Sequence, residues 1–99
     1  MYRIAYKKDL SEQVTLMKIE APLIAKKARP GQFIIFRIDE YGERVPLTIA
    51  DTDPEAGTVT IIFQKVGLST NLLGSMNAGD SILDFVGPLG AATDLDGIK

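Results

Sequence analysis

Short runs in which every second residue is apolar dominate this sequence, and no long amphipathic helix separates them. Such alternation is typical of β-strands with one buried face. The pattern predicts six strands, over residues 2–8, 14–20, 33–38, 45–50, 58–66 and 82–86. No helix is long enough to cover a second face of a sheet, so the sheet has to close on itself. We therefore expect an all-β fold, a six-stranded antiparallel Greek-key barrel.

Two of the expected strands carry irregularities. In the second strand the apolar alternation changes phase near Met17, which indicates a β-bulge. In the fourth strand Pro46 lacks a backbone N–H, so we expect this strand at a sheet edge or with its N–H side facing a gap.

One short helix is expected late in the chain, over about residues 69–76. Leu68, Leu72 and Leu73 follow helical spacing, and either Ser69 or Thr70 can cap the first turn. Residues 25–28 are expected to form a loop or a single helical turn. Residues 1–90 then make one barrel domain, and residues 91–99, which carry little apolar pattern, are expected to be a linker.

The residue types that are missing restrict the chemistry. The 99 residues contain neither cysteine nor histidine. This excludes disulfides, thiolate metal sites and cysteine nucleophiles within these residues, and it removes the commonest general base and metal ligand. We expect no metal site and no certain catalytic side chain, so any chemistry has to come from a bound cofactor.

Charge and hydropathy narrow the possible partners. The chain has 13 acidic and 11 basic residues, a net charge of −2, and neither sign forms a long block. No nucleic-acid footprint is therefore expected. No run of about 18 apolar residues and no signal-peptide pattern is present, so we expect a cytoplasmic protein without a membrane partner.

Two polar segments stand out as a candidate binding site. The first runs from Arg44 to Thr48 along the fourth strand; arginine pairs with phosphate, and a threonine hydroxyl can donate to a ring nitrogen. The second begins at Gly67, where a glycine precedes a hydroxyl-rich helix start. Backbone N–H groups and the helix dipole favour an anion there. Together the segments suit a flat cofactor that carries phosphates.

Each segment alone also has an ordinary structural explanation. Ser69 or Thr70 can be only a helix cap, and Gly67 can simply turn the chain. Arg44 can be an exposed arginine on an edge strand, which is the usual environment of arginine. The two segments together are more informative, because in a small barrel their strands can be neighbours.

Four motifs, in this order, resemble the FAD-binding barrel of the ferredoxin–NADP reductase superfamily over residues 2–90. They are a Pro-Gly-Gln-Phe turn at residues 30–33, a flavin-strand motif at 46–48, a Gly-x-x-Ser-like phosphate turn at 67–73, and a Gly-Asp and Gly-Pro-x-Gly exit at 79–80 and 87–90. Within this superfamily the chain resembles in particular the small subunits of NADH-dependent ferredoxin:NADP oxidoreductase, also named sulfide dehydrogenase, and the electron-transfer subunits of dihydroorotate dehydrogenase.

The resemblance implies roles for particular residues in FAD binding. Leu47 would pack on the isoalloxazine ring and Thr48 would bond flavin N5. The remaining cofactor-binding positions that it implies are Arg44, Pro46, Ile62, Phe63, Gln64, Gly67, Ser69 and Thr70, with contacts at residues 62–64 made largely through the backbone and pyrophosphate contacts at Ser69 and Thr70. The sequence departs from the family at two positions: Leu47 stands where the family has tyrosine, and Val45 stands where it has arginine, with Arg44 one residue earlier.

The resemblance also implies a larger enzyme. It would be an NAD(P)H-dependent flavoprotein oxidoreductase that exchanges electrons with ferredoxin or another iron–sulfur partner. Residues 91–99 would lead toward an absent NAD(P)-binding domain of the same chain, and a [2Fe–2S] cluster would lie in that missing part. An iron–sulfur flavoprotein large subunit is a further expected partner, and the fragment alone should be inactive. The alternative is a non-catalytic β-barrel that serves as a protein-interaction module.

Overall fold

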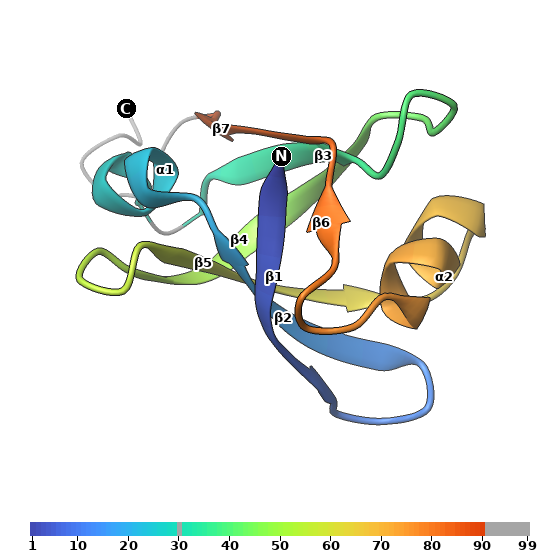
Figure 1. Cartoon of the computed structure of the whole chain (residues 1–99). Helices are drawn as coiled ribbons and strands as arrows, with labels where there is room; N and C mark the ends of the chain where they lie inside the picture. The colour runs from blue at the N-terminus through green and yellow to red at the C-terminus, as the bar shows by residue number, and fades with distance from the viewer. Residues whose placement is uncertain (30, 91–99) are drawn as a thin grey trace, which may run out of the picture.

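The computed structural model describes residues 1–29 and 31–90, and these form seven strands and two short helices (Figure 1). In chain order the elements are β1 (Tyr2–Asp9), β2 (Val14–Glu20), α1 (Pro22–Lys27), β3 (Phe33–Arg37), β4 (Val45–Asp53), β5 (Thr58–Gln64), α2 (Leu68–Ser75), β6 (Ser81–Ile82) and β7 (Asp84–Leu89). The expected linker, residues 91–99, lies outside the described residues, as does Pro30.

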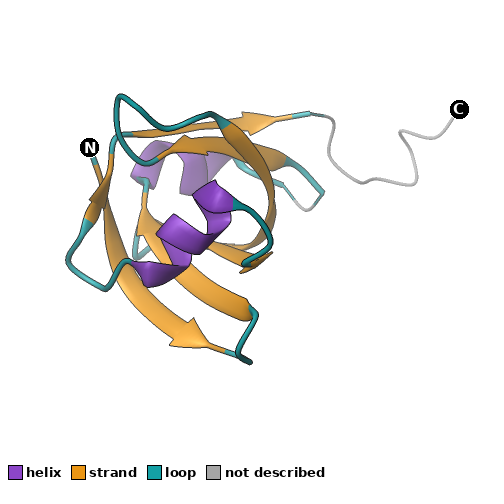
Figure 2. Ribbon diagram, turned by 90° about the vertical axis from the view of Figure 1, so that its right-hand side faces the viewer, coloured by secondary structure: helices purple, strands orange, loops and turns teal. Residues whose placement is uncertain are grey.

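The strands form one antiparallel sheet in the order β6-β1-β2-β5-β4-β3-β7. Pairing of β2 with β5, across the intervening β3 and β4, gives the expected Greek-key arrangement. The two ends of the order, β6 and β7, are separated in sequence only by Leu83, so the sheet nearly closes into a barrel. The helices lie on opposite sides of this barrel, as Figures 1 and 2 show from two directions. The all-β barrel prediction is confirmed.

The expected count of six strands is too low by one. Residues 82–86 were predicted as a single strand, but the chain changes partners at Leu83, which donates its backbone N–H to the Ile38 carbonyl at 3.1 Å. Before this residue β6 pairs with β1, and after it β7 pairs with β3. Alternating apolar residues continue through the change, so the pattern does not reveal it.

The first helix was also not predicted, since only a loop or one turn was expected near residues 25–28. Pro22 occupies the first turn of α1, where its missing N–H costs nothing, and Ile24 and Ala25 are buried. Six residues are too few to establish a helical period. The one helix that the sequence predicted, over about residues 69–76, is confirmed as α2 at Leu68–Ser75, displaced by one residue. Neither helix in the described part of the chain is long and apolar enough to cross a membrane.

The core consists of the inward faces of the strands together with Ile24 and Ala25 of α1 and Leu73 of α2. Along β5 the side chains of Val59, Ile61 and Phe63 are buried in the core, Ile62 and Gln64 are exposed, and Thr60 between the buried positions is 8% exposed. The largest fully buried apolar side chains are Ile4, Met17, Ile19, Ile34, Phe36, Val59, Ile61, Leu73, Ile82 and Phe85.

The phase change predicted for β2 belongs instead to β1. Pairing of β2 with β5 runs without interruption, whereas the β1–β2 register shifts between Ile4 and Tyr6. Met17 therefore stays in phase with the buried face, and Tyr6 turns outward with 46% of its surface exposed. The bulge is thus one strand away from its expected place. In β2 the buried phase is Thr15, Met17 and Ile19, and the polar Thr15 hides this phase in the sequence.

Pro46 lies in a half of β4 that has one strand beside it. Val45 to Thr48 pair with β3, and pairing with β5 begins only at Ile49. Among the described strands β4 therefore has an unpaired side along its first four residues. The expectation that the strand borders a gap near Pro46 agrees with this register, and the gap exposes part of the predicted flavin strand.

Candidate functional site

The structure brings the two predicted segments onto adjoining strands. β4 carries Pro46, Leu47 and Thr48, its second half pairs with β5, and β5 leads through Gly67 into α2. The neighbourhood expected from the sequence is therefore present. It arises because the short loop between β4 and β5 makes them a hairpin.

An open depression of about 410 Å³ lies beside the first half of β4. Its lining consists of Gly31, Phe33, Pro46, Leu47 and Thr48. Pro46 and Thr48 are exposed, whereas Leu47 is half-buried and packs against the core. The surface available to a ring is therefore provided mainly by Pro46 and Thr48, with Leu47 contributing only its exposed part.

A second depression, of about 430 Å³, lies between the β3–β4 loop and α2. Its lining consists of Asp39, Tyr41, Gly42, Glu43, Leu68, Ser69 and Leu72. Glu43 lines this depression and Pro46, three residues later in the chain, lines the first; the two hollows share no lining residue.

The two hydroxyls at the start of α2 have different tasks. The Thr70 hydroxyl accepts the backbone N–H groups of Val66 and Gly67 at 3.1 and 3.0 Å, so the third residue of α2 bonds back to the N-cap residue, which is Gly67 and not Ser69 or Thr70 as expected. Ser69 is 8% exposed and instead donates its hydroxyl to a Glu43 carboxylate oxygen at 3.1 Å. Of the two predicted phosphate ligands, Ser69 is the one that the helix cap does not use.

Thr70→Ala should therefore destabilise the fold by about 1–2 kcal/mol, because the Gly67 N–H loses its acceptor and the Val66 N–H keeps only the Gln64 carbonyl. The measurement is the free energy of unfolding from urea titration monitored by circular dichroism. Thr70→Ser keeps the hydroxyl and should stay within about 0.5 kcal/mol of the parent. Equal losses in both variants would mean that the threonine methyl group, and not the cap, stabilises this turn.

Gly67 has a conformation that does not require glycine. Its φ of −138° and ψ of 179° are ordinary extended values, and a Cβ atom added here would meet nothing within 4 Å. The fold thus gives no packing or conformational reason for a glycine. A bare backbone at the start of α2 does leave room for a ligand to approach closely.

Arg44 is not directed to α2. It precedes β4, its side chain is 64% exposed, and its Nη2 lies 3.6 Å from an oxygen of Asp84. The same oxygen pairs with Arg37 Nη2 at 2.7 Å. Asp84 thus holds two arginines on the outer surface near β3 and β7, and the pairing of Arg44 with phosphate stays a prediction.

The remaining predicted positions lie on β5. Ile62 and Gln64 point outward, while the Phe63 side chain is buried in the core, which leaves only its backbone for a ligand. Sequence reasoning did not include Gly31, Phe33 and Glu43 among the site residues. Phe33 pairs in register with Thr48, but that pairing was not evident from the residues. Nothing in the sequence connects Glu43 with Ser69, 26 positions away.

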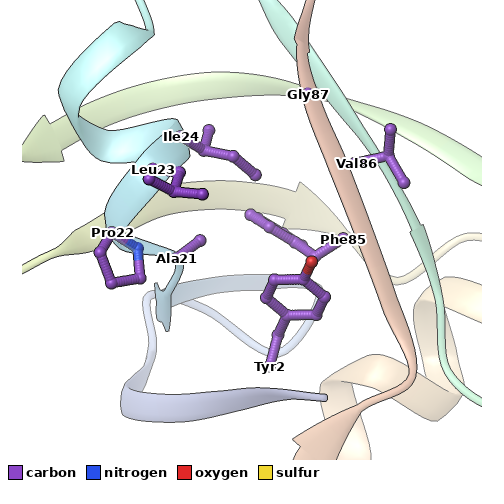
Figure 3. A pocket seen from close by; sticks show the side chains of 8 residues that line it. All are labelled: Tyr2, Ala21, Pro22, Leu23, Ile24, Phe85, Val86 and Gly87. Atoms are coloured by element: carbon purple, nitrogen blue, oxygen red, sulfur yellow. The ribbon is translucent and has the colours of Figure 1, made fainter.

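A third hollow, of about 300 Å³, lies on another part of the barrel and is apolar (Figure 3). Leu23 and Ile24 of α1 border it on one side, Phe85 and Val86 of β7 on the other, and the Tyr2 ring lies at one end. None of the predicted site residues contributes to its lining, which is completed by Ala21, Pro22 and Gly87.

Comparison with known proteins identifies relatives of this barrel. No family model matches the chain. It is 57% identical over 94 residues to an uncharacterized protein in the adh 3′ region of Clostridium beijerinckii, which covers 95% of this chain and 32% of that protein. It is 44% identical over 93 residues to the electron transfer subunit homolog of dihydroorotate dehydrogenase B (NAD(+)) from Thermotoga maritima, covering 94% and 33%. The chain thus spans about a third of the length of these relatives.

Solved structures agree with these sequence relatives. A chain of the NADH-dependent reduced ferredoxin-NADP oxidoreductase, studied for flavin-based electron bifurcation, is 44% identical and superimposes with a TM-score of 0.92 over 95% of this chain and 34% of that one. The cytochrome b5 reductase domain of Ulva prolifera nitrate reductase, at 17% identity and a TM-score of 0.67, shares the fold over 90% of this chain and 40% of that one. The predicted resemblance is confirmed. The chain is a homologue of part of an electron-transfer subunit of the dihydroorotate dehydrogenase B and ferredoxin-NADP oxidoreductase type, and it shares its fold with a cytochrome b5 reductase domain.

Proposed function

We propose that this chain is the FAD-binding barrel of a flavoprotein oxidoreductase that moves electrons between NAD(P)H and ferredoxin or another iron–sulfur partner. The observation that carries the proposal is the pair of hollows beside β4 and α2, in a chain 44% identical to an oxidoreductase of known structure. Four of the residues predicted to contact FAD line these hollows: Pro46, Leu47 and Thr48 the first, and Ser69 the second.

The donor groups present suit the cofactor. In the described part of the structure the exposed Thr48 hydroxyl has no hydrogen-bond partner, and it lines the hollow predicted to take the ring. Gly67 leaves a bare backbone before the N-terminus of α2, and Ser69 adds a hydroxyl donor there. A neutral ring acceptor and an anionic tail are the two chemistries that such groups bind.

When bound, FAD would supply the hydride and electron chemistry that the side chains of this barrel cannot perform. The chain's own contribution would be to bind and orient. Thr48 would donate a hydrogen bond to flavin N5, and Pro46 and Leu47 would border the ring. Ser69 and the first backbone N–H groups of α2 would hold the pyrophosphate, and backbone at Ile62, Phe63 and Gln64 would complete the wall. No proton transfer is assigned to a side chain.

The rest of the enzyme is part of the same proposal. Since the chain spans about a third of its relatives, an NAD(P)-binding domain in the same polypeptide would provide the site for NAD(P)H. A [2Fe–2S] cluster, an iron–sulfur flavoprotein large subunit and ferredoxin would complete the electron path. The barrel alone should then bind FAD without turning over NAD(P)H.

Thr48→Ala tests the ring contact. Loss of one hydrogen bond should weaken FAD binding about threefold to tenfold, measured as quenching of flavin fluorescence during titration with protein. Thr48→Ser retains the hydroxyl and should bind as the parent does. If saturating FAD gave neither quenching nor a thermal shift with the parent chain, the proposed function would be wrong. If the Thr48→Ala and Thr48→Ser variants bound FAD equally well, the role of Thr48 would be wrong, and the proposed function would stand.

A further inference from the structure

A carboxylate already lies at the position where the proposed function requires a phosphate. The Glu43 carboxylate accepts the Ser69 hydroxyl at 3.1 Å, and Ser69 is the second residue of α2. The positive end of the helix dipole stabilises an anion at this place. Glu43 is thus bound as an anion by the same group that is proposed to bind pyrophosphate.

The charges around the contact between Glu43 and Ser69 disfavour the binding of a second anion. The residues that line the hollow between the β3–β4 loop and α2 include two acids, Asp39 and Glu43, and no lysine or arginine. The nearest arginine in sequence, Arg44, is turned to Asp84. A pyrophosphate entering the hollow would therefore meet like charge, which raises the free energy of the bound state.

The Glu43 side chain can move away from Ser69 without a change in the backbone of the β3–β4 loop. It is an exposed residue just before β4, and the turn ahead of it is held by its own bonds, from the backbone N–H of Tyr41 to the Asp39 side chain and from that of Gly42 to the Asp39 carbonyl. Rotation about the side-chain bonds of Glu43 is enough to free the Ser69 hydroxyl. Such rotations in exposed side chains are fast.

We propose that Glu43 occupies the phosphate position at the N-terminus of α2, competes there with the pyrophosphate of the ligand, and so sets a lower affinity than the barrel would otherwise have. The proposal rests on the proposed function and adds a residue that regulates the same site. Ser69 is bonded to Glu43 in the free protein and to the ligand in the complex.

Glu43→Gln provides the test, with Glu40→Gln as the matched control because Glu40 is an exposed acid of the same loop outside the lining of the hollow. Dissociation constants for FAD and for ADP, which carries the pyrophosphate without the flavin, are measured by fluorescence quenching and by calorimetry. Glu43→Gln should bind both ligands roughly tenfold tighter than the parent, because it removes a full charge beside the pyrophosphate. Glu40→Gln should change either constant by less than about twofold.

The outcomes separate this inference from the proposed function. Suppose that the parent binds FAD and that Glu43→Gln binds it with the same affinity as the parent and Glu40→Gln, or more weakly than they do. The proposed competition is then refuted, and the assignment of a flavin site stands. A weaker variant would make Glu43 a hydrogen-bond acceptor for the ligand. If no variant binds FAD or ADP, the flavin assignment fails and the competition with it.

Discussion

Phe36→Ala should destabilise the barrel by about 3–5 kcal/mol, the largest effect expected from one substitution in this chain. Phe36 is completely buried on β3, where it is opposite Val45 of β4 and Phe85 of β7. Removing the ring loses apolar burial and leaves a cavity that the paired strands cannot collapse to fill. A domain of this size has only about 5–15 kcal/mol of stability in total, so the variant should be close to unfolding.

Chemical denaturation followed by circular dichroism measures this loss. Tyr41→Ala is the matched control, because it also removes an aromatic ring, but one that is 90% exposed; it should change the free energy of unfolding by less than about 0.5 kcal/mol. If Phe36→Ala does not fold at all, Phe36→Leu keeps most of the volume and should cost about 1–1.5 kcal/mol. A loss below 1 kcal/mol for Phe36→Ala would contradict the placement of Phe36 in the core.

The strand that carries Phe36 is one of the elements that the sequence predicted correctly, at residues 33–38 against the observed Phe33–Arg37. Alternation of apolar residues located the strands because a half-buried strand requires it, and β3 does have neighbours on both sides. The sequence did not predict where strands change partners. The change of partner at Leu83 and the bulge near Ala5 both depend on backbone pairing between segments far apart in the sequence. Neither of them interrupts the alternation of apolar residues enough to be recognised from the sequence.

The site shows the same division between local and distant effects. The motifs located Pro46, Thr48 and the start of α2, because those features come from neighbouring residues. The sequence did not show which hydroxyl bonds the backbone at the helix start, nor that Arg44 faces Asp84 and Glu43 faces Ser69. These pairs join residues 40 and 26 positions apart, so they follow from the topology of the barrel and not from any local pattern.

Gly67 offers the sharpest separation between folding and ligand binding. Gly67→Ala should leave the free energy of unfolding within about 0.5 kcal/mol, because the extended backbone accepts alanine and no atom lies within 4 Å of the added Cβ. The same methyl group would fill the space through which a pyrophosphate reaches the N–H groups of α2. Loss of those charge-assisted hydrogen bonds should weaken FAD binding roughly tenfold to a hundredfold.

Gly79→Ala should show the opposite behaviour and serves as the control. Gly79 also has open space around its Cα, but its φ is +99°, a conformation that strains any residue with a Cβ. This variant should lose about 1–2 kcal/mol of stability while keeping the FAD affinity of the parent, since Gly79 lines neither hollow. Both properties are measured on the same preparations, by urea unfolding and by flavin fluorescence quenching. If Gly67→Ala kept full affinity, close approach of the ligand to this backbone would be wrong, and a ligand would have to be held by the side chains of β4 and Ser69 alone.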